Sequence, residues 1–204
     1  MLDSTLRKLI DPPLNLAANH LAKVLSANSI TIIGFFIGFL SFIAIIKGQF
    51  TLALVFLTVN RLADGLDGAV ARRDGHDGAT DLGSYLDITA DFLLWALLPL
   101  GFALHDSDNA LAAAVLLSSF AMSMTVFLAF AMLAEKRGLS SDAQGKKGFY
   151  YIAGLAEGSE TILFFMLVML MPIWFIPAAL IFAGFVYLSV FGRLIVSINH
   201  FWEL

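Results

Sequence analysis

Four aspartates stand close together in a part of the chain that is otherwise almost entirely apolar: Asp64, Asp67, Asp87 and Asp91. The first two are three residues apart and the last two are four apart, so each pair would share one face of an α-helix. Like charges at this range disfavour ionisation, so a pocket holding all four needs protons or cations. Oxygen ligands suit Mg²⁺, Mn²⁺ or Ca²⁺, and two metals held by carboxylates are a known arrangement for phosphoryl chemistry. The spacing therefore predicts a divalent-metal site.

Small residues are interleaved with these aspartates: Gly65, Gly68, Ala71 and Gly83. Their short side chains leave room for a bulky substrate to approach the backbone. Taken alone, the glycines fit close helix packing in a membrane equally well. Each aspartate pair also has an alternative when taken alone, which is pairing with Arg61 or Arg72 for the first and a proton relay for the second. The four aspartates together, with glycines between them, favour the metal site.

The elements that must position these residues are six apolar stretches, each long enough to cross a bilayer core, which takes about 20 residues. They cover residues 29–47, 51–72, 82–104, 109–134, 149–171 and 173–198. The second stretch ends with the first aspartate pair, and the third begins with the second pair. We therefore expect an all-α integral membrane protein with six transmembrane helices, forming one domain over residues 1–204. Residues 1–24 mix apolar and charged side chains and predict an amphipathic helix lying on the membrane, interrupted at Pro12-Pro13.

The composition supports this class of protein. Of the 204 residues, 59% are apolar and 14% are charged, whereas a soluble domain is nearer half apolar and a quarter charged. These values exclude a disordered chain, an ordinary soluble enzyme and a basic domain with nucleic acid as its partner. Membrane lipids are the expected surroundings. The chain has no cysteine, which excludes disulfides, Cys-ligated zinc and a thiol nucleophile.

Lysines and arginines concentrate in the N-terminal segment and in the second-to-third and fourth-to-fifth connections of the expected helices. Positively charged connections stay on the cytoplasmic side of a membrane. Both termini are therefore expected in the cytoplasm. The aspartate pairs flank the connection over residues 73–81, so they are expected just below the cytoplasmic membrane surface.

These residues fit one long signature. The sequence resembles the CDP-alcohol phosphatidyltransferase family, whose signature D-x2-D-G-x2-A-R-x8-G-x3-D-x3-D corresponds to Asp64-Gly-Leu-Asp67-Gly68-Ala-Val-Ala71-Arg72 and Gly83-Ser-Tyr-Leu-Asp87-Ile-Thr-Ala-Asp91. The one departure within the signature is the spacer between Arg72 and Gly83, which has ten residues instead of eight. The extra residues fall in the glycine-bearing connection. They are expected to leave the aspartate faces unchanged.

The resemblance implies a centre of two Mg²⁺ or Mn²⁺ ions, with Asp64, Asp67 and Asp87 as ligands and Asp91 beside them at the metals. It implies that Asp91 also acts as the general base. Residues expected to contact the CDP part of the donor are Gly65, Gly68, Ala71, Arg72 and Gly83. The donor would be a CDP-linked lipid such as CDP-diacylglycerol, the acceptor an alcohol, and the leaving group CMP. The pattern is most similar to short bacterial inner-membrane members, and a homodimer is expected.

Charged residues near the cytoplasmic ends of the fifth and sixth expected helices are candidates for binding the acceptor: Lys146, Lys147, Glu157, Glu160 and Arg193. The lysines and Arg193 would suit a phosphate on the acceptor. Positive-inside anchoring explains the two lysines equally well. An ion pair with Glu157 or Glu160 is the alternative role of Arg193.

Three other functions remain open from the sequence. An intramembrane prenyltransferase also holds Mg²⁺-diphosphate with aspartates, but it would have two motifs far apart in a longer chain. A small cation or proton transporter would carry charges along a path through the bilayer, whereas here they gather in the cytoplasmic half. A non-catalytic membrane scaffold would not require the intact signature. The leading hypothesis is an enzyme that transfers a substituted phosphoryl group in phospholipid biosynthesis.

Overall fold

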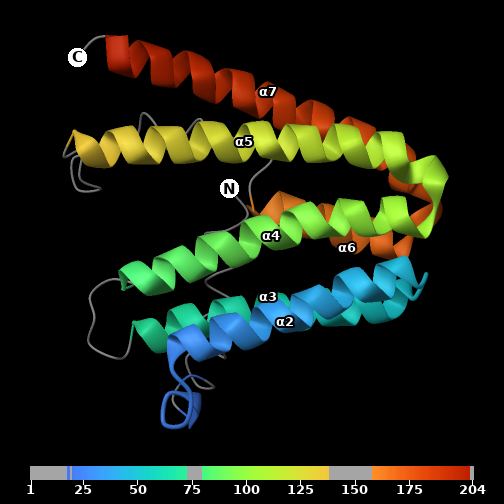
Figure 1. The fold of residues 1–204 in the computed structure, drawn as a ribbon, viewed down its shortest axis with the longest axis horizontal. Helices are drawn as coiled ribbons and strands as arrows, with labels where there is room; N and C mark the ends of the chain where they lie inside the picture. The colour runs from blue at the N-terminus through green and yellow to red at the C-terminus, as the bar shows by residue number, and fades with distance from the viewer. Residues whose placement is uncertain (1–17, 19, 73–79, 138–157, 203–204) are drawn as a thin grey trace. The chain divides into compact units, whose positions relative to one another are not determined.

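The computed structural model describes residues 18, 20–72, 80–137 and 158–202 of the chain (Figure 1). In these residues the regular structure is helical, which confirms the all-α prediction. Six α-helices follow one another: α2 (Ala27–Ile46), α3 (Phe50–Ala71), α4 (Asp81–His105), α5 (Ala110–Lys136), α6 (Gly158–Leu170) and α7 (Phe175–Trp202). The chain forms two compact units, Met1–His105 and Asp106–Leu204, and each is described by itself.

Four segments of the described chain are long and apolar enough to cross a membrane: Ala27–Ile46, Asp81–His105, Ser107–Lys136 and Pro172–Asn199. They correspond to four of the six predicted spans. The helix α3 has 22 residues, but Arg61, Asp64 and Asp67 make its second half polar. The helix α6 has 13 residues, and the start of the predicted span 149–171 lies outside the described residues, as does most of the predicted interfacial helix over residues 1–24.

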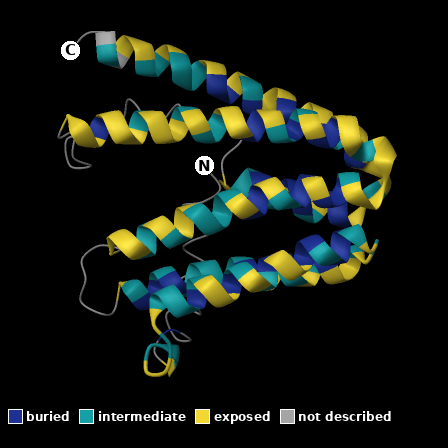
Figure 2. Ribbon diagram, in the orientation of Figure 1, coloured by how far each residue is buried: buried dark blue, intermediate teal, exposed yellow. Residues whose placement is uncertain are grey.

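Large apolar side chains cover the outside of the helices. Figure 2 shows exposed positions running along each helix. Of the large apolar residues, Leu111 of α5 is 76% exposed and Leu170 of α6 is 63% exposed. Such a surface would be a liability in water, because extended exposed apolar patches drive association. In a lipid bilayer the same surface faces acyl chains. The exposure pattern therefore agrees with an integral membrane protein.

In the first unit, α2 packs against both α3 and α4. Small residues allow the close approach, as is usual between membrane helices. A Cβ atom on Gly34 would lie 3.0 Å from the Ala63 Cβ of α3, and one on Gly101 of α4 would lie 3.1 Å from the Phe42 ring of α2. The buried Asn60 side chain donates a 2.8 Å hydrogen bond from Nδ2 to the Gly34 carbonyl. The helix α2 is thus the common support of the other two.

The turn between α2 and α3 is held against the end of α4. Gly48 has a φ of +69°, a conformation that favours glycine, and its backbone faces the His105 ring so closely that a Cβ would lie 2.8 Å from it. Phe50 stacks on Phe102 with ring centroids 5.6 Å apart. These contacts lie at the end of the unit away from the aspartates, and they join the start of α3 to the end of α4.

In the second unit, α5 packs along α7. Phenylalanines fill part of its interior, and Phe164 stacks on Phe182 at 4.5 Å between ring centroids. The Tyr187 hydroxyl of α7 donates to the Val115 carbonyl of α5 at 3.2 Å. This unit therefore combines an aromatic core with a few polar contacts between its long helices.

The packing of α2 on α3 is testable at Gly38, where a Cβ would lie 3.0 Å from Asn60 Nδ2 and 3.1 Å from Leu94 Cδ1. Asn60 is fixed by its hydrogen bond and Leu94 is fully buried, so neither side chain can move aside easily. We expect Gly38→Ala to lower the stability of the detergent-purified protein by about 1–3 kcal/mol, the usual effect of overpacking, measured as a drop in melting temperature. Gly184→Ala is the matched control, because its Cβ would meet nothing within 4 Å. Equal melting temperatures for the two variants would contradict this packing.

Candidate active site

Two helices of the first unit supply the predicted aspartates. Asp64 and Asp67 lie in the last two turns of α3, and Asp87 and Asp91 lie in the first three turns of α4. The start of α4 is fixed by Thr80, whose hydroxyl accepts a 3.1 Å hydrogen bond from the Gly83 backbone N–H. Because α2 packs on both helices, it is a common support of the two acidic segments.

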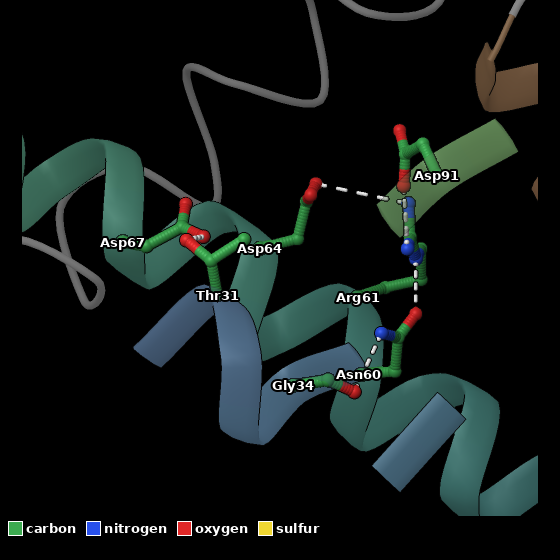
Figure 3. Close-up of polar contacts among 7 residues, drawn as sticks. All are labelled: Thr31, Gly34, Asn60, Arg61, Asp64, Asp67 and Asp91. Carbon is green, nitrogen blue, oxygen red and sulfur yellow. Dashed lines mark hydrogen bonds and ion pairs between the residues drawn. The ribbon is translucent and has the colours of Figure 1, made fainter. Parts of the chain in front are cut away.

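A guanidinium group lies between the acidic segments (Figure 3). Arg61 of α3 places Nη2 2.8 Å from a carboxylate oxygen of Asp91 and Nη1 3.8 Å from one of Asp64. Its side chain is 12% exposed, so this cation is mostly removed from solvent. Asp91 therefore has a close charge-assisted partner on the neighbouring helix, and Asp64 has a weaker one on its own helix.

Further contacts fix the position of Arg61. Its Nε donates a 2.7 Å hydrogen bond to Asn60 Oδ1, and Asn60 in turn donates to the Gly34 carbonyl of α2. The guanidinium also lies over the Trp95 ring of α4, 5.1 Å from the ring centroid, which is the geometry of a cation–π contact. The arginine is thus held directly by side chains of α3 and α4, and indirectly by α2 through Asn60.

Asp67 is turned towards α2. Its carboxylate accepts a 2.5 Å hydrogen bond from the Thr31 hydroxyl, and the residue is 8% exposed (Figure 3). Asp87 is exposed on α4. The structure therefore brings Asp64 and Asp91 together through Arg61, between α3 and α4, with Asp67 turned against α2.

The donor chemistry of this region fits a hard divalent cation, because carboxylate oxygens are the ligands that Mg²⁺ and Mn²⁺ prefer. The side-chain arrangement differs from the predicted convergence: within the described part of the chain, no three Asp, Glu or His side chains are grouped closely enough to hold a metal ion. The reason is visible in the contacts, since Asp91 is engaged by Arg61 and Asp67 by Thr31. The ligand assignment stays a prediction.

The small residues interleaved with the aspartates differ in how closely other side chains approach them. A Cβ on Gly83 would lie 3.1 Å from Thr80 Oγ1 and 3.2 Å from Asn28 Oδ1, so this glycine lets α4 begin close to the first turn of α2. A Cβ on Gly68 would lie 3.4 Å from a guanidinium nitrogen of Arg72, which is ordinary contact. The remaining two, Gly65 and Ala71, are half-buried on α3. Their predicted contacts with the CDP moiety stay predictions.

The candidate acceptor residues fall in the second unit. Arg193 of α7 donates from Nη1 to the Ser123 hydroxyl of α5 at 3.4 Å. Glu160 of α6 accepts a 2.9 Å hydrogen bond from the hydroxyl of Ser159. Three further candidates, Lys146, Lys147 and Glu157, lie outside the described residues. The acceptor assignments stay predictions.

Sequence reasoning missed three residues that shape the acidic region: Thr31, Asn60 and Trp95. For Thr31 and Asn60 the available signal was a hydroxyl or amide within an apolar helix, because such a group needs a hydrogen-bond partner in a membrane. The pairing of Arg61 with Asp64 is predicted by their three-residue spacing on one helix. The shorter contact of Arg61 with Asp91 joins two helices, so the spacing of residues could not predict it.

The fold and this acidic region define an all-α membrane protein with an aspartate-rich site on two consecutive helices. A sequence profile of the CDP-alcohol phosphatidyltransferase family matches residues 24–195. The chain belongs to this family. It is 43% identical over 195 residues to the inner membrane protein YnjF of Escherichia coli, covering 95% of this chain and 93% of that protein. It is 35% identical over 102 residues to archaetidylinositol phosphate synthase of Pyrococcus horikoshii, covering 50% of this chain and 53% of that protein.

Two solved structures share the fold. Both are of phosphatidylinositol phosphate synthase from Mycobacterium tuberculosis. The structure with bound CDP-DAG has a TM-score of 0.57 at 21% identity and covers 91% of this chain and 90% of its own. The structure in complex with manganese and citrate has a TM-score of 0.62 at 23% identity and covers 91% and 86%.

The contact between Thr31 and Asp67 is testable by deletion of the hydroxyl. We expect Thr31→Val to destabilise the protein in EDTA by about 1–3 kcal/mol, because a buried carboxylate loses its donor. Thr31→Ser keeps the hydroxyl donor, so its stability should be closer to that of the unchanged protein. Thr58→Val is the matched control, because the Thr58 hydroxyl bonds the Leu54 carbonyl of its own helix on an exposed face. The measurement is thermal unfolding, and equal losses in the two valine variants would refute the role of Thr31.

Proposed function

We propose that this protein transfers a phosphatidyl group from a CDP-linked lipid such as CDP-diacylglycerol to an alcohol acceptor and releases CMP. The observation that carries the proposal is the aspartate signature, with Arg61 joining Asp64 of α3 to Asp91 of α4, in a chain that belongs to the CDP-alcohol phosphatidyltransferase family. Support comes from the fold shared with a synthase whose structures contain CDP-DAG and manganese. The reaction requires a divalent cation, Mg²⁺ or Mn²⁺.

The roles we propose follow the chemistry of each group. Asp64, Asp67 and Asp87 hold the two metal ions, with Asp91 beside them. When bound, the metals neutralise the donor diphosphate and stabilise the charge on the leaving CMP. Gly65, Gly68, Ala71, Arg72 and Gly83 line the path of the CDP moiety.

The transfer itself needs a base, because an alcohol is a poor nucleophile until its proton is removed. In our proposal, a carboxylate oxygen of Asp91 accepts that proton. The acceptor oxygen forms a bond to the lipid-linked phosphorus, the bond from that phosphorus to CMP breaks, and CMP leaves with the electron pair. The contact between Arg61 and Asp91 keeps the Asp91 carboxylate oriented towards α3. The acyl chains of the donor stay in the bilayer that the apolar helix surfaces require.

The proposal includes the setting of the reaction. The protein would lie in the bacterial inner membrane as a homodimer, with both termini and the site on the cytoplasmic side. An inner membrane protein of E. coli is its relative over nearly the whole chain. On the acceptor side, Arg193, Glu160, Lys146, Lys147 and Glu157 are the candidates. A scaffold and a transporter are outcomes of the tests below, and no observation on the described residues favours either.

The activity is testable as CMP release by the full-length protein purified in detergent. The assay supplies CDP-diacylglycerol, Mg²⁺ or Mn²⁺, and one acceptor at a time: glycerol 3-phosphate, serine, inositol phosphate, inositol or a lipid alcohol. We expect CMP release with one of these acceptors, dependent on the metal and abolished by EDTA. A protein that binds neither metal nor the CDP-lipid would contradict the proposed enzyme and favour a scaffold or transporter.

The roles of single aspartates are testable in the same assay. We expect Asp67→Asn to abolish CMP release through loss of a metal ligand. At saturating metal, Asp91→Asn should still bind metal and the CDP-lipid but should slow transfer by about 10²–10⁴-fold, the usual contribution of a general base. Asp108→Asn is the control, because this exposed residue lies at the start of the second unit and should keep full activity. Preserved turnover in Asp67→Asn, or rescue of Asp91→Asn by excess metal, would overturn the respective role.

A further inference from the structure

Arg61 lies among the signature aspartates but belongs to none of the signature positions. Its guanidinium contacts Asp91 at 2.8 Å and Asp64 at 3.8 Å, and these are two of the four carboxylates that the proposed function assigns to the metal site. A positive charge therefore already occupies the region where divalent cations are expected to bind. The signature does not explain why the chain carries it.

The position of Arg61 does not depend on the carboxylates alone. Asn60, which is 5% exposed, accepts from Arg61 Nε at 2.7 Å and is itself tied to the Gly34 carbonyl of α2 at 2.8 Å. Trp95 provides an aromatic face 5.1 Å from the guanidinium carbon. A planar guanidinium suits this combination of a hydrogen bond, an aromatic face and two carboxylates better than an ammonium group would. The arginine is built into the site.

A mostly buried arginine beside carboxylates has two consequences for a metal. It lowers the cost of keeping like-charged aspartates close together when no metal is bound. It also opposes metal binding, because a divalent ion that takes an oxygen of Asp91 must displace the guanidinium or accept a like charge nearby. The contacts of Arg61 with Asp91 and Asp64 thus stabilise the metal-free form of the site and disfavour the metal-bound form.

We propose that Arg61 is the resident counter-ion of the acidic site and competes with the divalent metal for Asp91, so that it sets the metal affinity. This inference rests on the metal dependence in the proposed function. It makes Arg61 a positioning residue that acts through Asp91. Loss of its charge should destabilise the metal-free protein and strengthen metal binding. If the ion pair were merely structural, its removal would lower both the stability of the protein and its affinity for the metal.

The test is Mn²⁺ binding by the full-length protein, followed by electron paramagnetic resonance of free Mn²⁺, with the melting temperature measured in EDTA. We expect Arg61→Gln to bind Mn²⁺ on the order of tenfold more tightly, as for removal of one like charge from a partly shielded site. Its melting temperature in EDTA should fall, and the rise on adding Mn²⁺ should be larger than in the unchanged protein. Arg61→Lys keeps the charge without the guanidinium fork, so its Mn²⁺ affinity should lie between those of the unchanged protein and Arg61→Gln.

Arg137→Gln is the matched control, because Arg137 also lies over an aromatic ring, 4.9 Å from the Phe201 centroid, but in the other unit of the chain. It should bind Mn²⁺ like the unchanged protein. Equal or weaker Mn²⁺ binding by Arg61→Gln would overturn the competition. If Arg61→Gln fails to fold, Arg61→Lys decides the question by the same comparison. Failure of the unchanged protein to bind Mn²⁺ would instead refute the proposed metal centre itself, and the competition with it.

Discussion

The arrangement of the first unit depends on one electrostatic constraint: carboxylates grouped between apolar helices need a positive partner or a proton. In this structure the partner of Asp91 is Arg61, at 2.8 Å and mostly shielded from solvent. Removing one member of such a pair would leave a charge in poor solvent, which is far more costly than losing an exposed ion pair. The register of α4 against α3 is therefore tied to this contact.

The apolar helix α2 supports the polar site although it carries no charged residue. Its Gly34 carbonyl fixes Asn60, its Thr31 hydroxyl holds Asp67, and its Asn28 side chain lies next to Gly83 at the start of α4. Polar groups within an apolar helix form few but necessary contacts, because lipid offers them no alternative partner. The geometry of both acidic segments thus depends on a helix that contributes none of the signature residues.

The outlines of the fold were predictable because apolar run length is a strong signal in membrane chains. The predicted span 82–104 agrees closely with α4, which covers Asp81–His105. The predicted span 29–47 agrees with α2, which covers Ala27–Ile46. The signature predicts that four aspartates converge, and their role as metal ligands stays a prediction. It could not predict that Asp67 turns towards Thr31, or that Arg61 reaches Asp91 thirty positions further along the chain. Both are contacts between helices, which the spacing of residues on one helix does not determine.

Under the proposed function, an internal counter-ion would balance the acidic site while no metal is bound. Unbalanced carboxylates near the start of α4 would raise the cost of placing that helix in lipid. A guanidinium fixed by Asn60 and Trp95 offsets this cost while the site is metal-free. In our proposal, the same guanidinium makes metal binding weaker than four free carboxylates would allow. Under the proposed competition, assembly of the unit and affinity for the metal are linked through Arg61, and a gain in one is expected to come with a loss in the other.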